Sequence, residues 1–175
     1  MKPIINSRTI KSKFILFLVL LLIPSCETLK EDPLFIGSWQ FKDKIYSGDV
    51  VINTTHTLKL TKSTYEEVIV YQRDNSSSVM SLVGMRGNIS VKGTEITFTL
   101  TAFGGCLKDA SDKCTSTVEW YAKGSAKYNG YAALGLLEVY TGEADADEDY
   151  LWLVRDMNKD SDTEDTWEDI EFEKL

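Results

Sequence analysis

Apolar and polar side chains alternate along most of the chain after residue 34. In the clearest case, 95–103, apolar residues fill the even positions from 96 to 102 and threonines fill most of the odd ones. The segment 49–61 follows the same pattern, and the only histidine of the chain lies on its apolar side. A period of two is that of a strand with one buried face. The pattern therefore predicts a chain built from β-strands.

Eight or nine such segments follow one another, and no segment shows a convincing helical period. We expect strands at 35–41, 49–61, 65–73, 87–92, 95–103, 116–123, 131–141, 150–155 and 167–174. Gly93-Thr94 is a good hairpin turn, and 74–78 is a loop by composition. Short connections between successive strands favour an all-β, up-and-down antiparallel barrel of eight or nine strands over a sandwich, and closure removes exposed edges.

The first strand, 35–41, carries a glycine and a tryptophan two residues apart. Gly37 allows a sharp bend and a close approach of another strand. Trp39 points to the same side and is large enough to plug a barrel end. We expect these two residues to close the barrel.

The N-terminus has the features of a secretion signal. Its first 13 residues contain four basic and no acidic side chains, and ten apolar residues follow, Phe14 to Ile23. Ten residues are too few to span a bilayer, which needs about 20. The run ends in Ile23-Pro24-Ser25-Cys26, which resembles a bacterial lipoprotein signal. The resemblance implies that Cys26 becomes the first residue and carries lipid, such as palmitate. An ordinary signal peptide with an unmodified cysteine is the alternative.

These features divide the chain into three parts. We expect a signal peptide at 1–25, a lipidated polar tether at 26–33 and one barrel domain at 34–175. Acyl chains on Cys26 would attach the protein to a membrane by burying methylene groups. The expected location is the bacterial cell envelope, at the outer membrane. Residues 30–32 resemble signals for display on the cell surface, and a periplasm-facing position is the alternative.

The charge of the chain excludes one class of partner. Without the four basic residues of the leader, 15 Lys and Arg remain against 27 Asp and Glu, a formal charge of about −12. Such a surface repels nucleic acid and anionic lipid. We therefore expect no nucleic-acid partner.

Two cysteines flank a charged segment between strands. Cys106 and Cys114 are separated by seven residues, a comfortable length for a disulfide loop in an exported protein. A metal site is the alternative, but the chain has a single histidine, His56, which lies on an apolar strand face. The pattern favours a disulfide.

The signal, the tether, the Gly37-x-Trp39 strand and the succession of about eight strands together resemble the lipocalin-like lipoproteins of the calycin group. In that resemblance Asp149-Tyr150 matches a late-strand motif. Arg155 matches the basic residue that packs on the first-strand tryptophan, with Lys174 as an alternative partner. The C-terminal helix of lipocalins has no counterpart here. The resemblance implies a barrel that binds a small hydrophobic ligand.

The aromatic residues of several strands are the candidates for lining a ligand pocket. They are Tyr71, Phe98, Trp120, Tyr140 and Trp152. The alternative is that they fill a closed core, and that the protein is a structural or protein-interaction lipoprotein without a ligand. We expect no enzyme activity, because there is one histidine, no glycine-rich phosphate loop and no nucleophile elbow.

An acidic segment near the C-terminus spaces oxygen ligands two residues apart, as a calcium loop does. The candidate ligands are Asp156, Asn158, Asp160 and Asp162. Ser161 replaces the usual glycine, and the twelfth position is Trp167, which cannot coordinate. The alternative is a solvated loop, and no other cofactor is expected.

Overall fold

The computed structural model describes residues 33–135, 138–156 and 168–175. These residues belong to one compact unit, Pro33–Leu175. The expected signal peptide and Cys26 lie outside the described residues. Within the described residues, no helix has the length and the apolar content that a membrane crossing needs.

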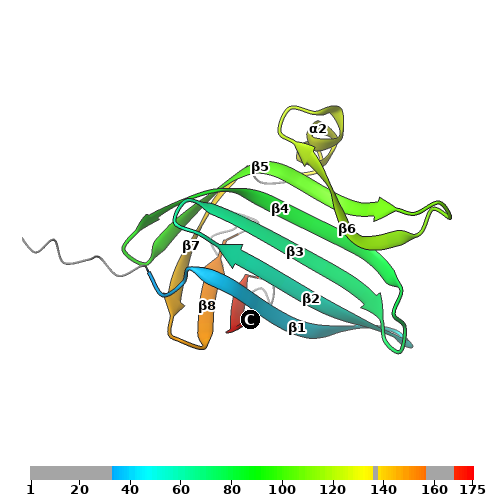
Figure 1. The fold of residues 1–175 in the computed structure, drawn as a ribbon, viewed down its shortest axis with the longest axis horizontal. Helices are drawn as coiled ribbons and strands as arrows, with labels where there is room; N and C mark the ends of the chain where they lie inside the picture. Colours follow the sequence, from blue (N-terminus) through cyan, green and yellow to red (C-terminus); the bar gives the residue numbers. More distant parts are fainter. Residues whose placement is uncertain (1–32, 136–137, 157–167) are drawn as a thin grey trace, which may run out of the picture. The chain divides into compact units, whose positions relative to one another are not determined.

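Nine strands and one short helix make up this unit (Figure 1). The strands are β1 (Gly37–Ser47), β2 (Val50–Leu60), β3 (Thr64–Arg73), β4 (Val79–Lys92), β5 (Glu95–Lys108), β6 (Cys114–Ala122), β7 (Val139–Ala146), β8 (Tyr150–Arg155) and β9 (Asp169–Lys174). The helix is α2 (Ala126–Ala132).

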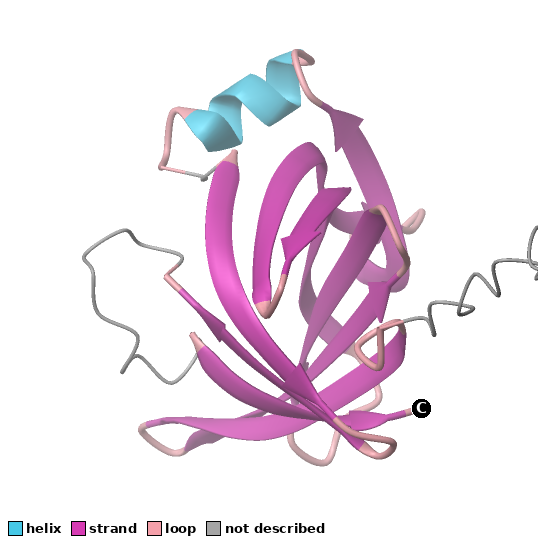
Figure 2. Ribbon diagram, turned by 90° about the vertical axis from the view of Figure 1, so that its left-hand side faces the viewer, coloured by secondary structure: helices cyan, strands magenta, loops and turns pink. Residues whose placement is uncertain are grey.

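Eight of the strands close into an antiparallel barrel. The hydrogen-bonded order is β4-β3-β2-β1-β9-β8-β7-β5, and pairing of β4 with β5 completes the ring. In Figure 2 the strands curve round the interior, and α2 lies beside one end of them. The seam between β1 and β9 is short, with Trp39 opposite Lys174 and Gln40 opposite Glu173. The predicted fold class is thus confirmed, with β6 as an extra strand.

Strand β5 changes partner halfway along its length. Its first half, from Glu95 to Thr99, pairs with β7, whereas Ala102 to Lys108 pair with β6. Strand β6 therefore lies outside the closed ring, attached to the second half of β5. Helix α2 follows β6 and leads the chain back to β7.

The structure corrects three of the expected elements. Strand β4 begins at Val79, earlier than the expected residue 87. A helix occupies Ala126–Ala132, where none was expected, and the strand expected at 131–141 is β7, Val139–Ala146. Ser125 starts the helix by accepting a hydrogen bond from the Tyr128 N–H, and the Tyr128 side chain is fully buried. In β7 the inward positions after Tyr140 are only glycine and alanine, so its alternation is weak in the sequence.

One end of the barrel interior is filled with side chains. Trp39 is completely buried there, and its indole N–H donates a 2.8 Å hydrogen bond to the Phe35 carbonyl. The Lys174 ammonium lies 5.5 Å from the centre of the Trp39 ring. Lys174 is thus the cation on this tryptophan, and Arg155, which was the first expectation, is engaged elsewhere. Leu58, Phe172 and their neighbours complete the core at this end.

Trp120 packs on the outer side of the barrel. Gly84 of β4 and Gly104 of β5 lie opposite each other, and the indole covers both. A Cβ atom at Gly84 would lie 2.8 Å from the Trp120 ring, so the glycine is needed for this close approach. The Arg86 guanidinium lies 4.4 Å from the centre of the same ring. Trp120 therefore attaches the extra strand to β4 and β5, and does not line the interior.

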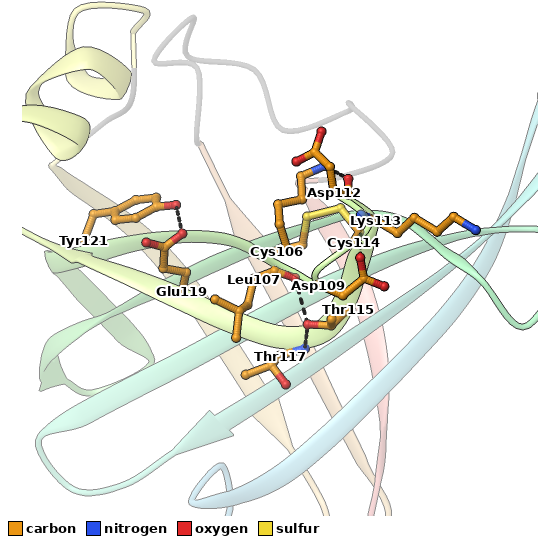
Figure 3. Close-up of a disulfide and its surroundings, with 11 residues drawn as sticks. Cys106, Leu107, Asp109, Asp112, Lys113, Cys114, Thr115, Thr117, Glu119 and Tyr121 are labelled. Atoms are coloured by element: carbon orange, nitrogen blue, oxygen red, sulfur yellow. Dashed lines mark hydrogen bonds between the residues drawn. A yellow bond between two sulfur atoms is a disulfide. The ribbon is translucent and has the colours of Figure 1, made fainter.

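The disulfide predicted from the cysteine spacing is present (Figure 3). Cys106 and Cys114 are bonded across the β5–β6 hairpin, with their Cα atoms 5.3 Å apart. Next to it, the Thr115 hydroxyl donates to the Leu107 carbonyl. The bond links the two strands near the tip of this hairpin, and β6 is the last strand in the order of the sheet.

Removing the disulfide should destabilise the domain moderately. The double substitution Cys106→Ser/Cys114→Ser is expected to lower the free energy of unfolding by about 2–3 kcal/mol, because the open chain gains entropy when unfolded. Urea denaturation of both proteins measures the difference. Equal midpoints for the two proteins would show that the bridge contributes nothing to stability.

Candidate ligand-binding site

A cavity of about 340 Å³ lies inside the barrel beyond the filled end. Six strands contribute to its wall, and along β1 it extends from Phe41 to Ile45, away from Trp39. Its lining residues are Phe41, Asp43, Ile45, Thr54, His56, Glu67, Ile69, Tyr71, Met85, Arg155 and Ile170. Six of these residues are apolar or aromatic, and five are polar or charged.

The same alternation that builds the core builds this cavity. On β3 the inward residues are Tyr65, Glu67, Ile69 and Tyr71, and every second side chain points to the same side of a strand. Tyr65 belongs to the filled core, whereas Ile69 and Tyr71 line the cavity. Depth along the strand thus decides whether an inward residue packs in the core or faces the cavity.

A buried ion pair forms the floor. Glu67 of β3 and Arg155 of β8 are 88 residues apart in the chain, and their side chains are 0% and 2% exposed. The Arg155 guanidinium donates from Nη1 to Oε2 at 2.6 Å and from Nη2 to Oε1 at 3.2 Å. This two-bond arrangement fixes both side chains across the interior. The pair separates the cavity from the filled core.

The electrostatics of the floor follow from this pairing. Burial is the largest single influence on Glu67 and raises its pKa, but the charge and hydrogen bonds of Arg155 together with His56 outweigh burial and lower that pKa to about 2. Burial is likewise the largest single influence on Arg155 and acts against its charge, but Glu67 and Tyr140 together offset burial and raise the Arg155 pKa. Both groups are therefore charged near neutral pH, and their charges cancel.

His56 lies beside the ion pair. Its Nδ1 is 3.8 Å from Glu67 Oε1, beyond hydrogen-bond distance, and its ring makes an edge-on contact with Phe41 at 5.5 Å. Among the described residues, neither His56 Nδ1 nor Arg155 Nε has a hydrogen-bond partner, although both atoms are buried. The floor thus retains polar groups that a ligand could satisfy.

The space below the floor is filled by aromatic rings. Phe98 stacks on Tyr140 at 4.9 Å, and Tyr65 meets Phe98 edge-on at 5.1 Å. Burial raises the pKa of Tyr140 to about 12, so this ring stays neutral. Phe98 and Tyr140 were candidates for the pocket lining, but the structure places them in this packed layer, because they lie nearer the filled end of the barrel.

The other sequence-predicted residues are distributed over several parts of the fold. Tyr71 lines the cavity, whereas Trp120 lies on the outer surface. Trp152 is also outside, 52% exposed, and its indole N–H donates to the Asp169 carboxylate. Its neighbours Leu151 and Leu153 take the inward positions on β8, which turns Trp152 outward.

The calcium candidates are only partly described. Asp156 follows β8 and is half-buried, whereas Asn158, Asp160 and Asp162 lie outside the described residues. In the part of the chain that the structure describes, no group of three or more His, Cys, Asp or Glu side chains is placed to hold a metal ion.

Glu67 is the functional candidate that the sequence analysis missed. Its signal was present: on strand 65–73 it occupies an inward position between Tyr65 and Ile69. An acid on the apolar side of a strand needs a buried partner. The lipocalin resemblance places its partner, Arg155, on Trp39 instead.

Comparison of the chain with protein-family models and with curated proteins finds no match in either. The functional argument therefore depends on the residues and their geometry.

The ion pair makes the stability of the domain sensitive to acid. Glu67 has a folded-state pKa of about 2 against its ordinary value of 4.5, so its contribution is complete above about pH 4.5 and is lost as the pH falls toward 2. The free energy of unfolding, measured in urea at a series of pH values, should fall more steeply in this range than for the double variant Glu67→Gln/Arg155→Met. Parallel curves for the two proteins would contradict the assignment.

Proposed function

We propose that the protein is a binding protein and not an enzyme: a lipocalin-like barrel, anchored by lipid on Cys26 in a bacterial cell envelope, that holds one small, mainly apolar ligand. The observation that carries the proposal is the cavity between the ion pair and the barrel mouth. Its volume of about 340 Å³ lies within the range of small-molecule sites. Eight-stranded barrels are wide enough to hold one small ligand.

A fluorescent apolar probe tests ligand binding directly. N-phenyl-1-naphthylamine should bind saturably to the chain from residue 26 onward carrying Cys26→Ser, which leaves out the expected leader and the lipid. Ile69→Phe places a larger side chain in the cavity and should weaken binding at least about tenfold, or about 1.4 kcal/mol.

The matched control is Val70→Phe on the same strand. Residue 70 points to the opposite side of β3, so this variant should bind the probe as the parent protein does. Absence of saturable binding, or equal effects of the two substitutions, would contradict the proposal.

The anchor is tested separately in a bacterial host. Labelled palmitate should be incorporated into the full chain, and Cys26→Ser should abolish the label and release the protein from the membrane fraction. A Cys26→Ser protein that still sediments with membranes would contradict lipid anchoring through this residue.

A protein-interaction role is the second candidate. It is favoured by Tyr150 and Trp152, which are 45% and 52% exposed on β8 between the acidic residues Asp145 and Glu171 of the neighbouring strands. In this case Trp152→Ala should abolish co-isolation of an envelope partner and leave probe binding unchanged. If Trp152→Ala leaves co-isolation of the partner unaffected, the outer face of β8 has no role in protein interaction.

A further inference from the structure

We propose that the cavity selects ligands whose polar end is uncharged, such as a long-chain alcohol or amide, and that this end lies on the floor formed by His56, Glu67 and Arg155. The inference rests on the proposed function, because it specifies the ligand of the same cavity.

The first argument is the charge balance of the floor. Arg155 is the only basic residue besides His56 among those that line the cavity, and both of its Nη atoms already bind Glu67. With His56 neutral, a ligand carboxylate would therefore be buried beside Glu67 without a free cation. A ligand ammonium would likewise find the Glu67 charge already neutralised. Burying an unpaired ion is expensive, so either charge should weaken binding.

The charge at the open end of the cavity also disfavours anionic ligands. Asp43 is the charged residue on the upper part of the wall, where it is exposed. Counting Asp43, Glu67 and Arg155, the lining carries a formal charge of −1 when His56 is neutral. An anion is thus opposed at the entrance as well as at the floor.

The second argument is the hydrogen-bonding capacity left on the floor. His56 Nδ1 and Arg155 Nε are buried without partners among the described residues. A buried polar group without a partner is unfavourable, so a ligand that hydrogen-bonds to one of these atoms binds better than a purely apolar ligand. A hydroxyl both donates and accepts, and a neutral imidazole also offers one donor and one acceptor. An uncharged polar group is therefore complementary to this floor.

The arrangement of the cavity wall predicts how a ligand is oriented. Above the floor the lining is mainly apolar, with Ile69 and Tyr71 on β3 and Ile45 near the mouth. An amphiphilic ligand that places its chain against these residues has its polar end against His56 and the ion pair.

A headgroup series with one chain length tests the selection. Decanol, decylamine and decanoate compete with N-phenyl-1-naphthylamine for the chain from residue 26 with Cys26→Ser, near neutral pH. Every strand of the barrel lies within Pro33–Leu175, so this chain retains the closed ring. Decanol should displace the probe at a concentration at least about tenfold lower than decanoate or decylamine.

A general preference of apolar cavities for uncharged molecules would give part of this result, so a variant must separate the two causes. Glu67→Gln removes the negative partner of Arg155 and keeps the shape of the side chain. Decanoate should then become the strongest of the three competitors. The control is Glu66→Gln, at the exposed outward position next to it, which should keep the original order. An unchanged order in a folded Glu67→Gln protein overturns the inference.

The single histidine gives a second readout that does not depend on the variant. In a protein without an added tag, decanol should shift the His56 ring signals in an NMR titration, and decanoate should shift them much less. Decanol that displaces the probe without moving the ring signals, or equal shifts for both competitors, overturns the inference.

The two proposals fail in different ways. If decanoate competes as well as decanol, the cavity binds ligands and only the selection is wrong. If the probe does not bind at all, the proposed function fails and the inference with it.

Discussion

Replacing Arg155 by methionine is expected to lower the free energy of unfolding by about 3–5 kcal/mol, because it leaves the Glu67 carboxylate buried without its partner. Both side chains are almost completely buried, and among the described residues Arg155 is the one that hydrogen-bonds to this carboxylate. Urea denaturation near neutral pH measures the loss.

The double variant Glu67→Gln/Arg155→Met is the control. It removes both charges, so it should recover most of the stability that Arg155→Met loses, since the cost comes from the uncompensated ion and not from missing volume. If the double variant is less stable than Arg155→Met, the floor is not organised around this pair.

Replacing Trp39 by alanine is expected to lower the free energy of unfolding by about 3–5 kcal/mol. The ring is completely buried at the filled end of the barrel, beside the short seam between β1 and β9. The substitution removes its packing, its hydrogen bond to Phe35 and its contact with Lys174. Thermal and urea unfolding of the variant measure the effect.

Trp152→Ala is the matched control, since it deletes the same side chain from an outward position that is 52% exposed. This substitution should lower the free energy of unfolding by less than about 1 kcal/mol. Similar losses for the two tryptophans would mean that Trp39 does not close the barrel as described.

Much of the fold could be predicted from the period-two pattern. On β5 the apolar residues Ile96, Phe98 and Leu100 alternate with threonines as expected, but a register shift then places Phe103, and not Ala102, opposite the inward Met85. The Gly37-x-Trp39 strand begins the barrel with its indole inside, as expected. Strands with small or mixed residues were harder to recognise. In β4, Leu82 is buried on the outward side, and in β7 the inward side holds Gly142 and Ala144, so neither alternates clearly in hydropathy.

The candidate site could be predicted only in part, for a geometric reason. Alternation tells which side of a strand a residue occupies, but not how far along the barrel it lies. Phe98 and Tyr71 are both inward, yet one is in the packed layer and the other lines the cavity. Pairing of Glu67 with Arg155 depends on how the ring closes, which brings β3 and β8 to face each other across the interior. No local pattern carries that information.

NMR of isoleucine methyl groups during titration with N-phenyl-1-naphthylamine can distinguish a ligand cavity above the ion pair from the filled core below it. Ile45 and Ile69 line the cavity, whereas Ile89 and Ile96 belong to the packed core. We expect large, saturable shifts for Ile45 and Ile69 and small ones for Ile89 and Ile96. Shifts confined to the core residues, or no saturable shift at the cavity residues, would contradict a ligand cavity above the ion pair.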